Sequence, residues 1–245
     1  PKPTVSKDKE ANPVRRCFIA REEKVIYYFD VSQQELAMLF VMCGADDLLE
    51  KYMSGMDMHL YMAGQLGRPE CRDMVKANTF GKVYGKGIKK MALDQGISIQ
   101  QAKEEMAIYD AAFPFVKELE KQYKSELYQR KYVEDFFGKR YSIPPSQAYK
   151  AINAVDQGGC AQSFKMGLIA VDRWLRCPDE QILLLPYDEI QIEVPVKLRM
   201  SEKEWCLEII ERMTNIPQLL DRGLKLRVDV KKTTSNWASK EKVEL

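Results

Sequence analysis

The segment from Gln181 to Val196, QILLLPYDEIQIEVPV, constrains the fold most, because it has the pattern of an antiparallel β-hairpin. Its apolar runs at 182–185 and 190–194 flank a polar turn at 186–189 that contains Pro and Asp. Short apolar runs joined by such a turn are typical of two paired strands. We therefore expect an antiparallel sheet, with carboxylates at or near the tip of one hairpin.

A second strand also ends on a carboxylate. Lys24 to Phe29 (KVIYYF) is short, β-branched and aromatic, and Asp30 follows it. If this strand neighbours the hairpin, Asp30 and Asp188 meet at one edge of the sheet. Paired carboxylates suit Mg²⁺, with Mn²⁺ as an alternative, and could serve phosphoryl transfer. The alternative is that Asp30 is a strand-end turn residue and Asp188 an ordinary hairpin residue.

The stretch Arg72 to Gly85, RDMVKANTFGKVYG, is predicted to be a helix, since it contains no Pro. Arg72, Lys76, Phe80 and Tyr84 recur at steps of four, which places them on one slanted stripe about 18 Å long. Two cations followed by two rings would match a ligand with phosphates at one end and a base at the other. The alternative is a basic surface helix with two half-buried aromatic residues.

Composition limits the kinds of partner and metal site that the chain can have. The 38 cations and 36 anions give a net charge of +2, which neither implies nor excludes a polyanionic partner. No run of 18 apolar residues occurs, so no membrane partner is expected. Six cysteines without a CxxC pair predict reduced thiols in the cytoplasm. His59 is the single histidine, which excludes a His-rich metal site.

Most other segments have helical patterns. We expect helices to begin at Ser32, at Ser54 or Asp57, at Ser98 with a capping box, at Ser146 and at Ser201. Gly44 should close the first of these helices, and Pro114 should break the helix that starts at Ser98. A small hairpin or loop is predicted for 132–145, and a last strand for 224–230.

Three motifs in order resemble those of family A DNA polymerases, the group of bacterial polymerase I and related phage enzymes. They are DVSQQEL at 30–36, RDMVKANTFGKVYG at 72–85 and YDE at 187–189. Weaker similarities extend the resemblance over 13–240. Tyr187 stands where the family usually has His, and Thr79 where it usually has Asn.

The resemblance implies a template-directed DNA polymerase that uses Mg²⁺. Asp30 and Asp188 would hold two metal ions, and Glu189 would be an auxiliary acid. Arg72 and Lys76 would bind the triphosphate of a dNTP, with Lys76 as a proton donor to pyrophosphate. His59 would also contact the phosphates; the alternative is a solvated helix residue.

The remaining implied contacts concern the sugar, the base and the duplex. Phe80 and Tyr84 would pack against the nucleotide. Glu35, supported by Tyr84, would exclude a ribose 2′-hydroxyl. Primer–template DNA would contact Tyr187 and the pair Asn153 and Gln157; the alternative for that pair is helix capping and surface polarity.

The expected fold class is α+β, with an antiparallel palm in 1–56 and 150–245 and helical fingers in 57–149. The thumb of the family is expected to be absent, so another polypeptide would supply it and the upstream domains. A single-subunit RNA polymerase is disfavoured by Glu35 and Glu189. A non-catalytic nucleic-acid-binding subunit is the other alternative. We expect a cytoplasmic location, in the host if the gene belongs to a phage, with an organelle as an alternative.

Overall fold

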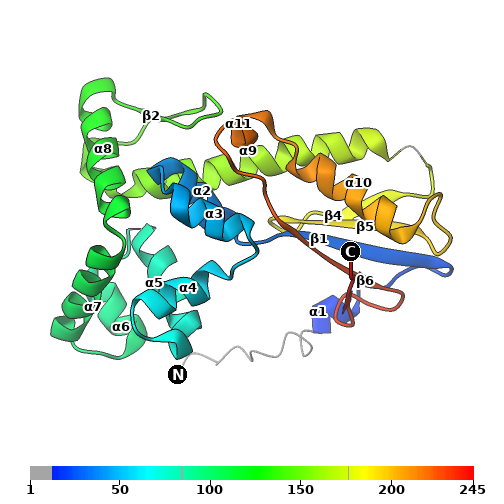
Figure 1. Ribbon diagram of the computed structural model, residues 1–245, viewed down its shortest axis with the longest axis horizontal. Helices are drawn as coiled ribbons and strands as arrows, with labels where there is room; N and C mark the ends of the chain where they lie inside the picture. Colours follow the sequence, from blue (N-terminus) through cyan, green and yellow to red (C-terminus); the bar gives the residue numbers. More distant parts are fainter. Residues whose placement is uncertain (1–12, 84, 176) are drawn as a thin grey trace. The chain divides into compact units, whose positions relative to one another are not determined.

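The computed structural model describes residues 13–83, 85–175 and 177–245, apart from the side chains of Cys71, Asn78, Phe80, Lys82 and Val83. The described chain is α+β, as expected, and divides into two compact units (Figure 1). Of the described residues, unit 1 contains 13–32, 164–175, 177–216 and 225–245, and unit 2 contains 33–83, 85–163 and 217–224. None of the described helices is long and apolar enough to cross a membrane.

Unit 1 is built on a five-stranded antiparallel sheet, so the predicted class of sheet is confirmed. The strands in spatial order are β4 (Gln181–Leu184), β5 (Glu189–Pro195), β1 (Lys24–Val31), β6 (Val228–Thr233) and β7 (Glu241–Lys242). β4 and β5 form the hairpin predicted from the sequence, and β5 pairs directly with β1.

The two faces of β1 differ because successive side chains of a strand point to opposite sides. Tyr27 and Phe29 pack against Trp205, with ring centroids 5.1 and 5.8 Å apart. Trp205 belongs to α10 (Glu202–Thr214), which begins after Ser201 as expected, and the structure adds a capping box between Ser201 and Glu204. This apolar face anchors the strand, and Asp30 lies on the other face.

The last predicted strand is displaced in the structure. We expected 224–230, but β6 spans Val228–Thr233 and is followed by β7. The Leu224 N–H instead donates to the Leu219 carbonyl, which ends α11 (Pro217–Leu220). The apolar alternation begins at Leu224, before the strand, and ends at Val230, inside it, and only pairing with β1 selects which of these residues enter the sheet.

Unit 2 is mainly helical (Figure 1). Its elements before the long helix are α2 (Gln34–Cys43), α3 (Asp46–Met53), α4 (Met58–Gln65), a 3₁₀ turn η2 (Pro69–Cys71), α5 (Arg72–Val83), α6 (Ile88–Gln95), α7 (Ile99–Ala112), α8 (Pro114–Arg130), the hairpin β2 (Val133–Glu134) with β3 (Arg140–Tyr141), and η3 (Pro145–Lys150). Helix α9 (Ala151–Trp174) starts in unit 2 and ends in unit 1, and α1 (Pro13–Arg16) precedes β1.

Several predicted helix boundaries are confirmed. Ser98 forms both hydrogen bonds of a capping box, and Pro114 separates α7 from α8. Gly44 ends α2 with a φ of 60°, a left-handed conformation that favours glycine.

Two predicted helix starts are wrong. α2 begins after Gln33, which has a left-handed conformation, while the Ser32 hydroxyl donates to Asp229 instead of capping the helix. The segment from Ser146 forms the 3₁₀ turn η3 before α9 begins at Ala151. A serine hydroxyl can bond a partner other than a helix N-terminus, as Ser32 does, so the residue type alone does not locate a helix start.

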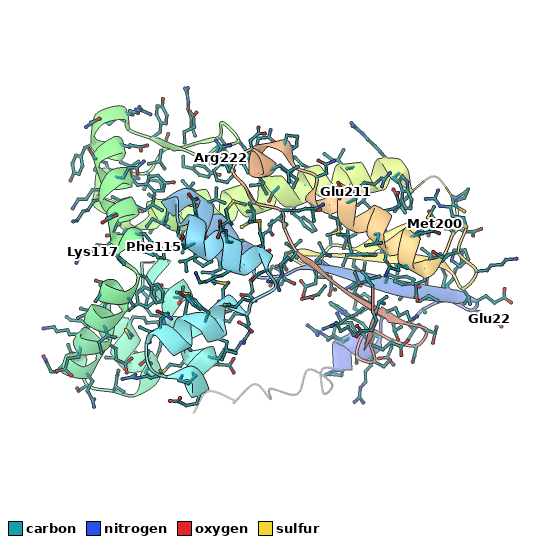
Figure 2. All side chains as sticks on the ribbon, viewed as in Figure 1. Glu22, Phe115, Lys117, Met200, Glu211 and Arg222 are labelled. Carbon is teal, nitrogen blue, oxygen red and sulfur yellow. The ribbon has the colours of Figure 1, made fainter. Side chains whose placement is uncertain are left out.

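The two units divide the chain at positions different from the expected palm and fingers limits, 56/57 and 149/150. Residues 33–56 belong to the helical unit because α2 packs on α8: the rings of Phe40 and Phe115, the latter labelled in Figure 2, lie edge to face at 6.4 Å. The start of α9 joins this unit as well, since Gln34 Nε2 donates to the Cys160 carbonyl and to Ser163 Oγ.

Candidate active site

Carboxylates from neighbouring strands lie in one row on the polar face of the sheet in unit 1. Asp30 of β1 is the direct cross-strand partner of Glu189 in β5 and of Asp229 in β6. Directly opposed residues of an antiparallel pair have side chains about 5 Å apart and on the same face. The row therefore concentrates negative charge near the end of β1.

Asp188 joins this row from the β4–β5 turn. The Val31 N–H donates to its carbonyl at 3.1 Å, which fixes the turn beside the end of β1. The charge of Asp188 is also close enough to Asp30 to raise the pKa of Asp30. The sequence-based expectation that the two strands neighbour each other is thus met.

The pKa of Asp30 is raised to about 6. Partial desolvation by the surrounding chain contributes most, although the side chain reaches the surface, followed by the charges of Asp188 and Glu189, while the Lys240 ammonium lowers it. Carboxylates crowded in this way repel each other unless a cation lies among them. The acidic row is therefore a place where a bound cation would be stabilised.

The Asp30 and Asp188 carboxylates fit Mg²⁺ or Mn²⁺ as a pair of protein ligands. Among the described residues, no group of three or more His, Cys, Asp or Glu side chains is arranged to hold a metal ion. Mg²⁺ commonly uses only one or two protein carboxylates, and takes its other ligands from water and phosphates. Asp30 and Asp188 supply oxygen donors of that kind and number.

Glu189 differs from its neighbours because cationic and amide groups engage both of its oxygens. Lys240 Nζ lies 2.8 Å from Oε2, and Gln191 Nε2 donates to Oε1 at 2.7 Å. Sequence reasoning missed both partners. The alternation of β5 could have placed Gln191 on the face of Glu189, whereas the position of Lys240, at the C-terminal end of the chain, depends on the sheet.

The basic residues lie in unit 2, where Asp57 connects α4 to α5. Of the two expected starts of α4, Ser54 and Asp57, the structure selects Asp57: its Oδ1 accepts from the backbone N–H groups of His59 and Leu60. Its other oxygen, Oδ2, lies 2.8 Å from both Nε and Nη2 of Arg72, the first residue of α5. One carboxylate thus fixes both the start of α4 and the side chain of Arg72.

His59 lies against the cationic end of α5. Its side chain is buried, with 1% of its surface exposed, so the alternative of a solvated helix residue is wrong. Its pKa is lowered to about 4, mainly by burial and further by the charges of Lys76 and Arg72. His59 is therefore a neutral imidazole at pH 7, next to two cations.

The helix predicted for 72–85 is present as α5, with Lys76 exposed on it and Thr79 buried. Tyr84 and the side chain of Phe80 lie outside the described residues. The cationic end of the stripe is thus part of the described structure, while the predicted contacts of its aromatic end stay predictions.

Glu35 is half-buried in the first turn of α2, and a second acid is close to it. Asp156 of α9 is buried, and burial together with the nearby Glu35 charge raises its pKa well above the usual range. The sequence pattern did not identify this buried acid.

The predicted DNA contacts lie on two elements. Asn153 and Gln157 are four residues apart on α9, and neither caps the helix. Gln157 is exposed, whereas Asn153 is half-buried. Tyr187 is 97% exposed at the β4–β5 turn, where its φ of 60° turns the chain.

Comparison with known proteins gives a consistent result. The family model described as DNA polymerase family A matches residues 3–239. The chain is 32% identical to the DNA polymerase of Mycobacterium phage L5 over 73% of its length, and 30% identical to DNA polymerase I of Helicobacter pylori strain 26695 over 75%. It spans only 31% and 22% of these two relatives.

A solved structure is similar as well. The POL domain of Pol1 from M. smegmatis, in complex with a DNA primer–template and a dNTP, superposes with a TM-score of 0.79 and 26% identity. The match covers 92% of this chain and 42% of that one.

Proposed function

Because this chain belongs to DNA polymerase family A, we propose that it carries the nucleotidyl-transfer site of a template-directed DNA polymerase. The observation that carries the proposal is the acidic row on the sheet, in which the charge of Asp188 is close enough to raise the pKa of Asp30. In unit 2, the cations Arg72 and Lys76, whose charges lower the pKa of His59, add the positive charge that a triphosphate needs.

The acids would act on the reacting oxygens. Asp30 and Asp188 would hold Mg²⁺, or Mn²⁺, which when bound stabilises the negative charge on the attacking 3′-oxygen and on the transferred phosphate. The raised pKa of Asp30 means that its carboxylate is more readily neutralised by a proton when no cation is near. Glu189 would act only as an auxiliary acid, because Lys240 and Gln191 engage its oxygens.

The basic helix would bind the leaving group. Arg72 presents a planar guanidinium suited to phosphate oxygens, and Asp57 orients it. Lys76 is exposed on the same helix and would give a proton to pyrophosphate as it leaves. His59 would contact the phosphates as a neutral hydrogen-bond donor, without adding charge.

Sugar and duplex recognition would come from other side chains. Phe80 and Tyr84 would pack against the incoming nucleotide, and the bulk of Glu35 would exclude a 2′-hydroxyl. Asn153, Gln157 and Tyr187 would contact primer–template DNA. We assign 1–56 and 150–245 to the palm and 57–149 to the fingers.

The grip on the duplex would need more protein than this chain contains. The matched part makes up only 31% and 22% of the two relatives, so we propose that further polymerase segments or a separate polypeptide supply the thumb and upstream domains. We further propose that the chain acts in the cytoplasm, without a membrane partner.

Primer extension tests the proposal. The chain is incubated with a labelled primer–template, the four dNTPs and Mg²⁺, alone and with co-purified polypeptides, and extension products are resolved on a denaturing gel. We expect template-directed extension that disappears in Asp30→Asn. Binding of the duplex without extension under both conditions would instead favour a non-catalytic nucleic-acid-binding subunit.

A further inference from the structure

Glu189 is held on both sides, although it is adjacent in sequence to Asp188. Its Oε2 pairs with Lys240 Nζ at 2.8 Å, and its Oε1 accepts from Gln191 Nε2 at 2.7 Å. The Glu189 and Lys240 side chains are only 10% and 15% exposed, and Gln191 is 1% exposed. Water therefore screens this ion pair much less than a surface pair.

Aromatic rings hold Lys240 in this position. Its Nζ lies 4.2 Å from the centroid of the Tyr28 ring and 5.7 Å from that of Trp237. Tyr28 is the cross-strand partner of Gln191, so the ring and the amide lie side by side on one face of the sheet. The backbone N–H of Trp237 donates to the Phe18 carbonyl, which ties the segment carrying Lys240 to the unit.

This arrangement affects what Glu189 can offer a cation. A carboxylate binds a metal ion through its oxygen lone pairs, and here one oxygen receives a charge-assisted bond and the other an amide bond. Moving Glu189 onto an ion would break these bonds and would leave the buried Lys240 ammonium without its closest carboxylate.

We propose that Lys240 and Gln191 are positioning residues that keep Glu189 out of the metal coordination sphere, so that the cation site consists of the Asp30 and Asp188 carboxylates. The inference rests on the proposed function, because it assumes that these two aspartates hold a divalent cation. It assigns a role to Lys240 and explains why Glu189, although next to Asp188 in sequence, does not join the two aspartates at the cation.

The test measures Mn²⁺ affinity of the full chain by electron paramagnetic resonance, without DNA or nucleotide. Lys240→Met keeps an unbranched side chain, one atom shorter, and removes its charge. We expect it to tighten Mn²⁺ binding by about threefold or more, since Glu189 becomes available and a nearby positive charge is lost. Lys240→Arg keeps a cation against Glu189, and its affinity should stay close to that of the unmodified chain.

A second background separates positioning from simple charge repulsion. In the Glu189→Gln variant, residue 189 has no carboxylate that the loss of Lys240 could release to the cation. Lys240→Met should therefore tighten Mn²⁺ binding clearly less in this variant than in the unmodified chain. An equal gain in both backgrounds would mean that Lys240 acts only through its charge and would overturn the proposal. No gain in either background would overturn it too.

Gln191→Leu provides a variant of unchanged charge, which keeps the proposal testable if Lys240→Met does not fold. It frees Oε1 of Glu189, so we expect tighter Mn²⁺ binding that disappears when Glu189→Gln is added. Unchanged affinity in Gln191→Leu would contradict its positioning role.

The failure of this inference can be told apart from the failure of the proposed function. If Asp30→Asn leaves Mn²⁺ binding intact, the proposed metal site is wrong and this inference fails with it. If Asp30→Asn abolishes binding while the Lys240 and Gln191 variants behave like the unmodified chain, only this inference is overturned.

Discussion

The Asp57 carboxylate holds the guanidinium of Arg72, with Oδ2 at 2.8 Å from both Nε and Nη2. The same carboxylate caps α4, so the helix carrying His59 and the basic helix share one anchor. Burial alone would raise the pKa of Asp57, but hydrogen bonds from Arg72 and from the Leu60 N–H outweigh it and lower that pKa.

Replacing Asp57 should separate its two roles. Asp57→Asn retains a capping oxygen but loses the ion pair, and we expect a loss of about 0.5–1 kcal/mol in the free energy of unfolding. Asp57→Ala also loses the cap, which should cost about 1 kcal/mol more. Urea unfolding measures both. Asp73→Asn is the control, since Asp73 is 77% exposed; an equal loss there would contradict the anchoring role.

Stability should depend on pH through His59, the only histidine in the chain. Its folded pKa of about 4 lies below its unfolded value, so the unfolded chain binds the additional proton as pH falls below about 6.5. Lowering the pH from 7.5 to 5.5 should destabilise the unmodified chain by on the order of 1 kcal/mol more than His59→Gln. Parallel pH dependence in the two proteins would refute the lowered pKa.

Asp30→Asn and Asp188→Asn should abolish primer extension while the chain stays folded. Full extension by either variant would disprove the metal assignment. Asp172→Asn, an exposed acid on α9, serves as a control that should extend primers normally.

The apo protein should also respond to Asp30→Asn. The folded pKa of Asp30, about 6, is above its unfolded value, so its ionisation destabilises the fold at pH 8, above both values. After allowance for solvent screening at this exposed position, the amide should stabilise the metal-free chain by about 1 kcal/mol, or about 2–4 °C in Tm. A lower Tm at pH 8 would contradict repulsion within the acidic row.

Glu35→Ala should admit ribonucleotides, because it removes the side chain expected to occupy the space of a 2′-hydroxyl. We expect the ratio of kcat/KM for dNTPs to that for rNTPs to fall by about ten- to a hundredfold. Glu35→Gln has nearly the same size and should retain most of the discrimination. Unchanged sugar selectivity in Glu35→Ala would argue against the gate.

Phe80→Tyr should ease the acceptance of dideoxynucleotides, because the added phenol hydroxyl can replace the contact of the missing 3′-hydroxyl. Chain-terminator sensitivity in primer extension measures this. Phe115→Tyr adds the same group on α8, in the packing against Phe40, and should leave the sensitivity unchanged. A Phe80→Tyr enzyme with ordinary sensitivity would show that the residue does not face the sugar.

Local sequence patterns predicted much of the fold. The β4–β5 hairpin, the strand ending near Asp30, and the caps at Asp57, Ser98 and Ser201 were all predictable. Each depends on residues within a few positions of one another, through side-chain alternation or a hydrogen bond to a nearby N–H. The sequence therefore determined which segments form helices and strands, and which of them carry acids and cations.

Only the tertiary structure decided which distant groups meet. Ser32 bonds Asp229 instead of capping α2, and Lys240 reaches Glu189 across 51 residues. Such contacts depend on strand register and burial, which no local window contains. The sequence placed Asp30 and Asp188 at strand ends, while the pairing of β1 with β5 brought them together and left Glu189 bound to Lys240.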